Sequence, residues 1–63
     1  MVTYESRVVA TGKDEFDVRC LSTDTKPTGT HDGREIANGS TLMEIDTGKV
    51  YMYDEDGDTW DEI

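Results

Sequence analysis

The 63-residue sequence has little of what small proteins use to brace a small core, with one cysteine, one proline and no long apolar run. The single cysteine, Cys20, excludes an intramolecular disulfide, so oxidative cross-linking does not support this chain. Because no run of 18 apolar residues occurs, no segment is predicted to span a membrane. The first residues also lack a basic stretch followed by an apolar one, so we expect no signal peptide and synthesis in a cytoplasm.

Basic residues are also scarce, since six Lys and Arg stand against fifteen Asp and Glu, for a net charge of −9. Such a chain lacks the basic footprint that binds nucleic acids or anionic membranes, so we expect neither as a partner. Residues 1–42 carry seven acids and five bases, whereas residues 43–63 carry eight acids and one base. A strongly acidic segment keeps a protein soluble, and it also suits a basic partner or mimics nucleic acid.

Apolar residues make up only 33% of the chain. Ordering the chain costs roughly 1.5 kcal/mol per residue, which so few apolar side chains only just offset. We therefore expect one small domain, residues 1–63, that is marginally stable alone or completes its burial against a partner.

The spacing of apolar and turn-forming residues predicts an all-β fold, since no stripe of helical period is present. Strands are predicted at residues 2–10, 15–22, 40–46, 49–54 and 58–63, with a long loop at 23–39. The first two strands form an N-terminal hairpin and the last three form a meander. We expect a small antiparallel sheet of four to five strands, with a small open barrel as a variant.

The predicted core consists of apolar side chains that alternate along these strands, where cross-strand pairs of aromatic and β-branched residues stabilise a sheet. Its expected members are Val8, Phe16, Val18, Leu21, Ile45, Tyr51, Tyr53 and Trp60. Cys20 lies in an apolar run and is expected to be a small buried side chain rather than a reactive thiol.

The acidic turn at residues 54–58 resembles part of a calcium-binding loop. If Gly57 held the invariant glycine position of such a loop, Met52 and Ile63 would hold its first and last ligand positions. Neither side chain carries an oxygen, so the segment is interpreted as an acidic hairpin turn.

Other short motifs also lack essential positions. Gly12-Lys13 and Gly48-Lys49 do not have the glycine spacing or the following Ser or Thr of a phosphate-binding loop. His31 is the only histidine, and one histidine with one cysteine is too few for a zinc site. We therefore predict no catalytic residue, no metal site and no cofactor.

A distinctive order of short motifs runs from Ser22 to Trp60. The motifs are Ser22-x-x-x-Lys26-Pro27, a loop, Asn38-Gly39-Ser40, a strand ending in Asp46-Thr47-Gly48-Lys49, then Tyr51-x-Tyr53-Asp54, a loop, and Trp60. This order resembles that of small structural proteins and short β modules of tailed bacteriophages. In many of those proteins the last turn is shorter and neutral, whereas here Glu55-Asp56-Gly57-Asp58 is acidic.

The resemblance implies a noncatalytic structural or accessory component of a bacteriophage virion, such as a capsid-decoration, head-fibre or tail-associated protein. Such a protein docks in multiple copies on capsid or tail subunits, as a homo-oligomer or multivalent assembly, after synthesis in the bacterial host cytoplasm. Docking elements are expected in the loop 23–39 and at the free edge of strand 2–10. Candidate partner contacts are Lys26, Pro27, Arg34, Ile36, Asp54, Asp56 and Asp58.

Two other functions stay open at this point. The acidic residues 43–63 would also suit a phage-encoded inhibitor that mimics nucleic acid and binds a basic host protein. Exposed stacking of Trp60 and the tyrosines would instead favour a carbohydrate-binding module.

Overall fold

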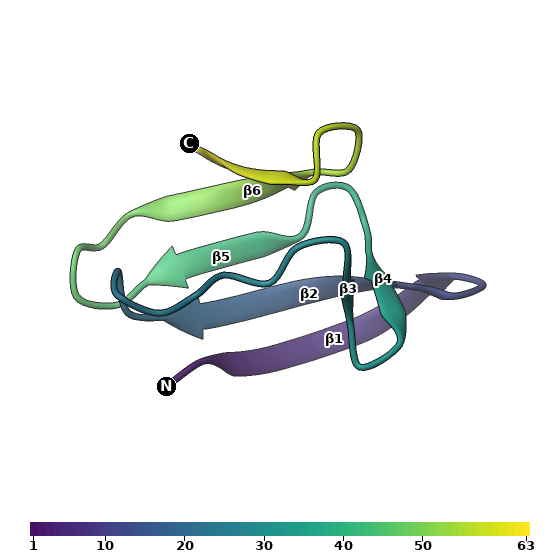
Figure 1. Cartoon of the computed structure of the whole chain (residues 1–63), viewed down its shortest axis with the longest axis horizontal. Helices are drawn as coiled ribbons and strands as arrows, with labels where there is room; N and C mark the ends of the chain where they lie inside the picture. The colour runs from purple at the N-terminus through teal and green to yellow at the C-terminus, as the bar shows by residue number, and fades with distance from the viewer.

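The computed structural model describes all residues from 1 to 63, which form one mixed β-sheet that does not close into a barrel (Figure 1). The strands are β1 (Thr3–Ala10), β2 (Lys13–Cys20), β3 (Thr30–His31), β4 (Arg34–Ile36), β5 (Thr41–Glu44), β6 (Val50–Asp54) and β7 (Thr59–Glu62). The prediction of an all-β fold is confirmed. The chain has no helix, and so none that is long and apolar enough to cross a membrane.

β2 is the central strand of the sheet. It pairs antiparallel with β1 along one edge, and on its other edge it pairs parallel with β4 and then with β5. The order β2-β5-β6-β7 continues as an antiparallel meander from β5 onward. The N-terminal hairpin and the C-terminal meander are therefore as predicted.

The expectation of a purely antiparallel sheet is wrong, because both β4 and β5 run parallel to β2. Parallel neighbours need a crossover of a dozen or more residues, and the long loop provides it. That loop also contributes the short strands β3 and β4, so the sheet has more strands than the four to five predicted.

Ser40 joins β4 and β5 along the shared edge of β2. Its buried hydroxyl accepts a hydrogen bond from the Phe16 backbone N at 3.0 Å and donates to the Ala37 carbonyl at 2.8 Å. Its own carbonyl accepts from the Tyr53 backbone N at 2.8 Å. The side chain thus replaces a backbone acceptor where neither short strand reaches the centre of β2.

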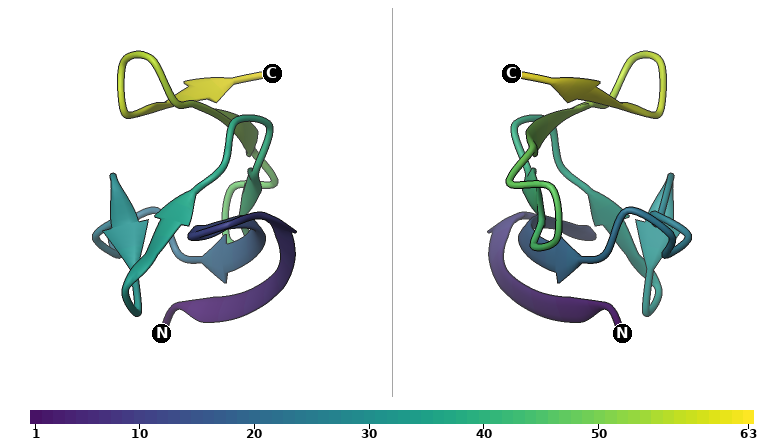
Figure 2. Two further views of the ribbon diagram at one scale, coloured as in Figure 1. Left: turned by 90° about the vertical axis from the view of Figure 1, so that its right-hand side faces the viewer. Right: turned by 90° about the vertical axis from the view of Figure 1, so that its left-hand side faces the viewer.

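The core lies on one face of this sheet, which curves around the segment carrying β3 and β4 (Figure 2). We call residues 21–33 the covering segment, because they lie across that face. The buried core side chains are Phe16, Val18, Cys20, Ile36, Leu42 and Tyr53, and the partly buried Val2, Tyr4, Tyr51 and Trp60 pack against them.

Three expected core residues are instead exposed, which corrects the prediction. Val8 is 69% exposed because it lies beside the bulge at the end of β1, and Leu21 is 40% exposed in the turn after β2. Ile45 is 62% exposed because it follows β5 on the same face as Met43, away from the core. Conversely Ile36, expected to contact a partner, is 1% exposed and points into the core from β4.

Candidate docking surfaces

Aromatic side chains of the sheet hold the covering segment in place. Trp60 Nε1 donates to the Pro27 carbonyl at 2.7 Å. The Tyr53 hydroxyl accepts from the Gly29 backbone N at 2.7 Å and donates to Asp58 Oδ1 at 2.9 Å. Burial raises the pKa of Tyr53, so its hydroxyl stays protonated as a donor. Pro27 and Asp58, two of the predicted partner contacts, therefore serve the fold itself.

A buried carboxylate provides a further tether. Glu44 lies on the core side of β5 and forms an ion pair with Lys26 at 2.8 Å, while Thr47 Oγ1 donates to it at 2.7 Å. The hydrogen bond from Lys26 lowers the pKa of Glu44, and the same bond raises the pKa of Lys26. Lys26 also lies 5.7 Å from the centre of the Tyr51 ring. The ammonium group of Lys26, a predicted partner contact, therefore forms its contacts within the chain.

Two side chains that could react or bind a metal ion, Cys20 and His31, are packed in the core region instead. Cys20 is fully buried, and burial raises the pKa of its thiol, which disfavours the reactive thiolate. The His31 ring stacks on Tyr4 with 3.7 Å between ring centroids and meets Phe16 edge-on at 5.5 Å. The chain holds no group of three or more His, Cys, Asp or Glu side chains placed to bind a metal ion.

The remaining predicted contacts divide between the fold and the surface. Arg34 forms an ion pair with Asp14 at 2.9 Å, across the parallel pairing of β4 and β2. In the last turn, Asp54 Oδ1 accepts a hydrogen bond from the Asp56 backbone N at 3.0 Å, and the Asp56 side chain is exposed. Asp56, which is exposed and whose carboxylate makes no hydrogen bond, is therefore the predicted contact best placed at the surface.

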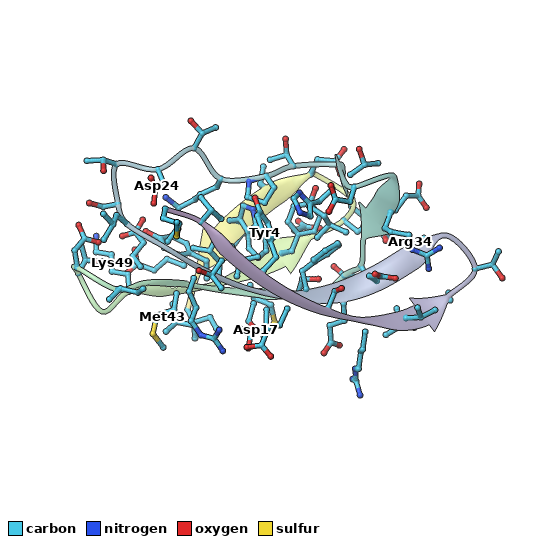
Figure 3. All side chains as sticks on the ribbon, turned by 90° about the horizontal axis from the view of Figure 1, so that it is seen from below. Tyr4, Asp17, Asp24, Arg34, Met43 and Lys49 are labelled. Carbon is cyan, nitrogen blue, oxygen red and sulfur yellow. The ribbon has the colours of Figure 1, made fainter.

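The opposite face of the sheet has no covering segment. We call it the open face. Figure 3 shows Tyr4 directed toward the covering segment, whereas Met43 and Asp17 extend from the other side of the sheet. Met43 lies directly opposite Val50, and the Ile63 backbone N donates to the Val50 carbonyl at 2.9 Å, so these residues form a row.

The row belongs to an apolar cluster on the open face over β5, β6 and the C-terminus, and sequence reasoning missed it. Its members are Met43, Ile45, Val50, Met52 and Ile63, four of which are between 44% and 76% exposed. The signal was the alternation along β5 and β6, where Met43, Ile45 and Met52 share one parity class of the sheet. Sequence reasoning placed Ile45 of this face in the core, and on β6 it assigned the core to Tyr51 and Tyr53, on the other face.

Charged residues occupy the β1–β2 half of the open face. Arg19 pairs with Glu5 at 2.9 Å and with Asp17 at 3.4 Å, and Arg7 pairs with Glu15 at 3.3 Å. Glu5, Asp17, Arg7 and Glu15 contribute to a shallow, mostly polar hollow of about 270 Å³. The open face therefore has an ion-paired half and an apolar half.

The sheet also has three free edges, one of them on the two-residue strand β3, which pairs only with β4. β1 pairs only with β2, and β7 pairs only with β6. No backbone hydrogen bond outside the strand pairing involves residues 3–10. The outer edge of β1, anticipated as a docking element, is therefore free.

No protein-family model, curated protein or solved structure matches this chain.

Proposed function

We propose that this chain is a noncatalytic structural component of a bacteriophage virion, which docks in multiple copies on the head or tail. The observation that supports docking is the apolar cluster of the open face. A chain with so few apolar residues leaves Met43, Met52 and Ile63 exposed together on one uncovered face. Contiguous exposed apolar side chains of this kind mark interaction surfaces. The assignment to a virion comes from the order of motifs between Ser22 and Trp60.

Charge defines what the docked surface should look like. The apolar cluster is bordered by acids on β6 and β7, namely Asp54 and Asp61, and residues 43–63 carry eight acids against one base. A complementary surface on a capsid or tail subunit would be an apolar patch with Lys and Arg around it. Each copy contributes modest binding energy, and a symmetric lattice raises the total through avidity.

The test is to detect the protein in particles and then to disturb the cluster. Quantitative mass spectrometry of purified phage particles should find the chain at a fixed ratio to the major shell or tail protein. Met43→Asp and Met52→Asp should fold like the wild type but reduce incorporation at least about tenfold, because each introduces a charge at an apolar contact. Val9→Asp is the matched control, since Val9 is 47% exposed but lies on the N-terminal hairpin. Absence from particles, or equal incorporation of the variants, would contradict the proposal.

A second candidate is favoured by the exposure of the acidic end. Asp56, Asp58, Asp61 and Glu62 are all exposed on the last turn and β7, as an inhibitor that mimics nucleic acid requires. This alternative predicts a complex with a basic host protein that dissociates as salt is raised, together with absence from particles.

A further inference from the structure

We infer that a second copy of this chain binds along the free edge of β1, antiparallel and centred on Ser6. This inference goes beyond the proposed docking role, because it concerns a different surface and does not depend on a virion. β1 is eight residues long, contains no proline, and forms its strand pairing on one side only. An edge with these properties is a template for another strand.

The structure limits how much of this edge is free for pairing. The register of β1 against β2 is regular from Thr3 to Val8 and then shifts between Val8 and Ala10, where a bulge lies. Bulges bend an edge and end regular pairing. Within this regular stretch, a symmetric pairing can be centred on Glu5, over residues 3–7, or on Ser6, over residues 4–8.

Strand geometry then selects the register. When two copies of one strand pair antiparallel, facing residues must both be even-numbered or both be odd-numbered, so that their backbone N–H and C=O groups meet. The two-fold axis therefore passes midway between the two copies of one residue. An axis at Ser6 sets Glu5 opposite Arg7 of the second copy, and Arg7 opposite Glu5. It also sets the 69% exposed Val8 opposite Tyr4. Opposite charges and aromatic–aliphatic pairs are the cross-strand contacts that stabilise sheets.

Neighbouring registers are unfavourable. An axis at Glu5 sets two glutamates opposite each other, and an axis at Arg7 does the same with two arginines, which is destabilising. The free edge of β7, which is four residues long, is also protected. Pairing centred on Asp61 opposes two aspartates, and pairing centred on Trp60 opposes Asp58 and Glu62.

The distribution of charge favours the same edge. Residues 1–22 carry four acids and three bases, so the hairpin is nearly neutral although the chain has a net charge of −9. The acidic strand β7 lies at the opposite end of the sheet from β1 (Figure 1). Four strand spacings separate them, on the order of 19 Å, whereas charges are screened over about 8 Å at physiological salt. Two copies can therefore meet at β1 with little repulsion between their acidic ends.

This pairing has a geometric consequence for docking. Residues directly opposite in a sheet project from the same face, so the two-fold axis is perpendicular to the sheet. Both open faces would then lie on one side of a continuous sheet, and both covering segments on the other. A dimer of this form would present two apolar clusters to one binding surface.

Disulfide trapping of the full chain tests the two-fold axis. Facing residues across an antiparallel pair have Cα atoms about 4.5–5.5 Å apart, within the range that a disulfide bridges. Ser6→Cys should therefore form a covalent dimer under mild oxidation at least about tenfold faster than Thr59→Cys, which places the thiol on the exposed β7 edge. The wild type should not form this dimer, because Cys20 is buried.

Charge reversal tests the register independently. Glu5→Arg and Arg7→Glu should each weaken self-association in sedimentation equilibrium about tenfold, since each converts two symmetric attractive pairs into repulsive ones. The double variant E5R/R7E should restore self-association, because the opposite charges face each other again. Within one copy, the double variant loses the ion pairs of Glu5 with Arg19 and of Arg7 with Glu15. Restored self-association would therefore come from contacts between the two copies.

Circular dichroism and Trp60 fluorescence show whether each variant remains folded. Equal trapping of Ser6→Cys and Thr59→Cys would overturn the inference. The inference would also be overturned if either single charge reversal left self-association unchanged. It would be overturned as well if the folded double variant self-associated as weakly as the single variants.

Discussion

The covered and open faces of this sheet both carry apolar side chains, but these are buried on the covered face and largely exposed on the open face. On the covered face Leu42 and Tyr53 are buried beneath a segment that has few apolar residues of its own. On the open face Met43 and Met52 remain nearly half exposed. A single sheet of this size has enough chain to cover one face only. The covered face therefore carries the stability, and the open face is available for binding.

Neighbouring residues on β5 provide the strongest test of this difference. Leu42→Ala removes a fully buried side chain and should lower the free energy of unfolding by about 2–5 kcal/mol. Met43→Ala, one residue along and 45% exposed, should change it by less than about 0.5 kcal/mol. Urea denaturation followed by Trp60 fluorescence measures both. Similar losses for the two variants would mean that the open face also supports the fold.

β5 also shows why the hydrophobic pattern selected the wrong face. In the run Leu42-Met43-Glu44-Ile45, the odd positions are both apolar, so alternation alone assigns Met43 and Ile45 to the core. The structure instead buries Leu42 and Glu44. A buried carboxylate is favourable only because Lys26 reaches it from the covering segment. Periodicity cannot detect a partner that lies 18 residues away.

The parallel pairing was missed for a related reason. Each predicted strand had a turn beside it that suited a hairpin, and hairpins make neighbours antiparallel. The long connection before residue 40 is also long enough for a crossover, but local propensity does not show where its short strands pair. Once β4 lies parallel beside β2, Ile36 must enter the core. What could be predicted was local: the all-β class, the first hairpin, the last meander, and Phe16, Val18 and Tyr53 as apolar strand positions.

The tether between Tyr53 and the covering segment gives the next largest expected effect. Tyr53→Phe keeps the ring but removes the acceptor of the Gly29 backbone N, which is left without its partner. Because Gly29 is only half-buried, we expect a loss of about 0.5–1.5 kcal/mol in the free energy of unfolding, the usual net contribution of one hydrogen bond. Hydrogen exchange at the Gly29 amide should accelerate as the covering segment loosens.

Tyr4→Phe is the matched control, since Tyr4 contributes its ring to the stack with His31. It should change stability by less than Tyr53→Phe. Equal effects would show that the hydrogen bond of the Tyr53 hydroxyl does not hold the covering segment.

The smallest expected effect concerns Glu44 and depends on pH. Because Lys26 lowers the pKa of Glu44 below its ordinary value of 4.5, the folded state holds this carboxylate ionised more strongly than the unfolded chain does. The wild type should therefore be more stable than Glu44→Gln above pH 4.5. That advantage should shrink as the pH falls through the lowered pKa, where the folded state also takes up the proton. Thermal unfolding of both proteins between pH 7 and pH 3 measures the difference. The repulsion from the net charge of −9 acts nearly equally on the two and largely cancels.

Lys26→Met separates the ion pair from other effects of the substitution. In that background the Glu44→Gln difference should lose most of its pH dependence, because the group that lowers the Glu44 pKa is absent. A pH dependence of the same sign that persists without Lys26 would assign the lowered pKa mainly to Thr47, which also donates to Glu44, with a smaller contribution from Tyr51. Glu44 would then be stabilised by the turn between β5 and β6, within the meander. The ion pair with Lys26 would contribute less to holding the covering segment on the sheet than its short distance indicates.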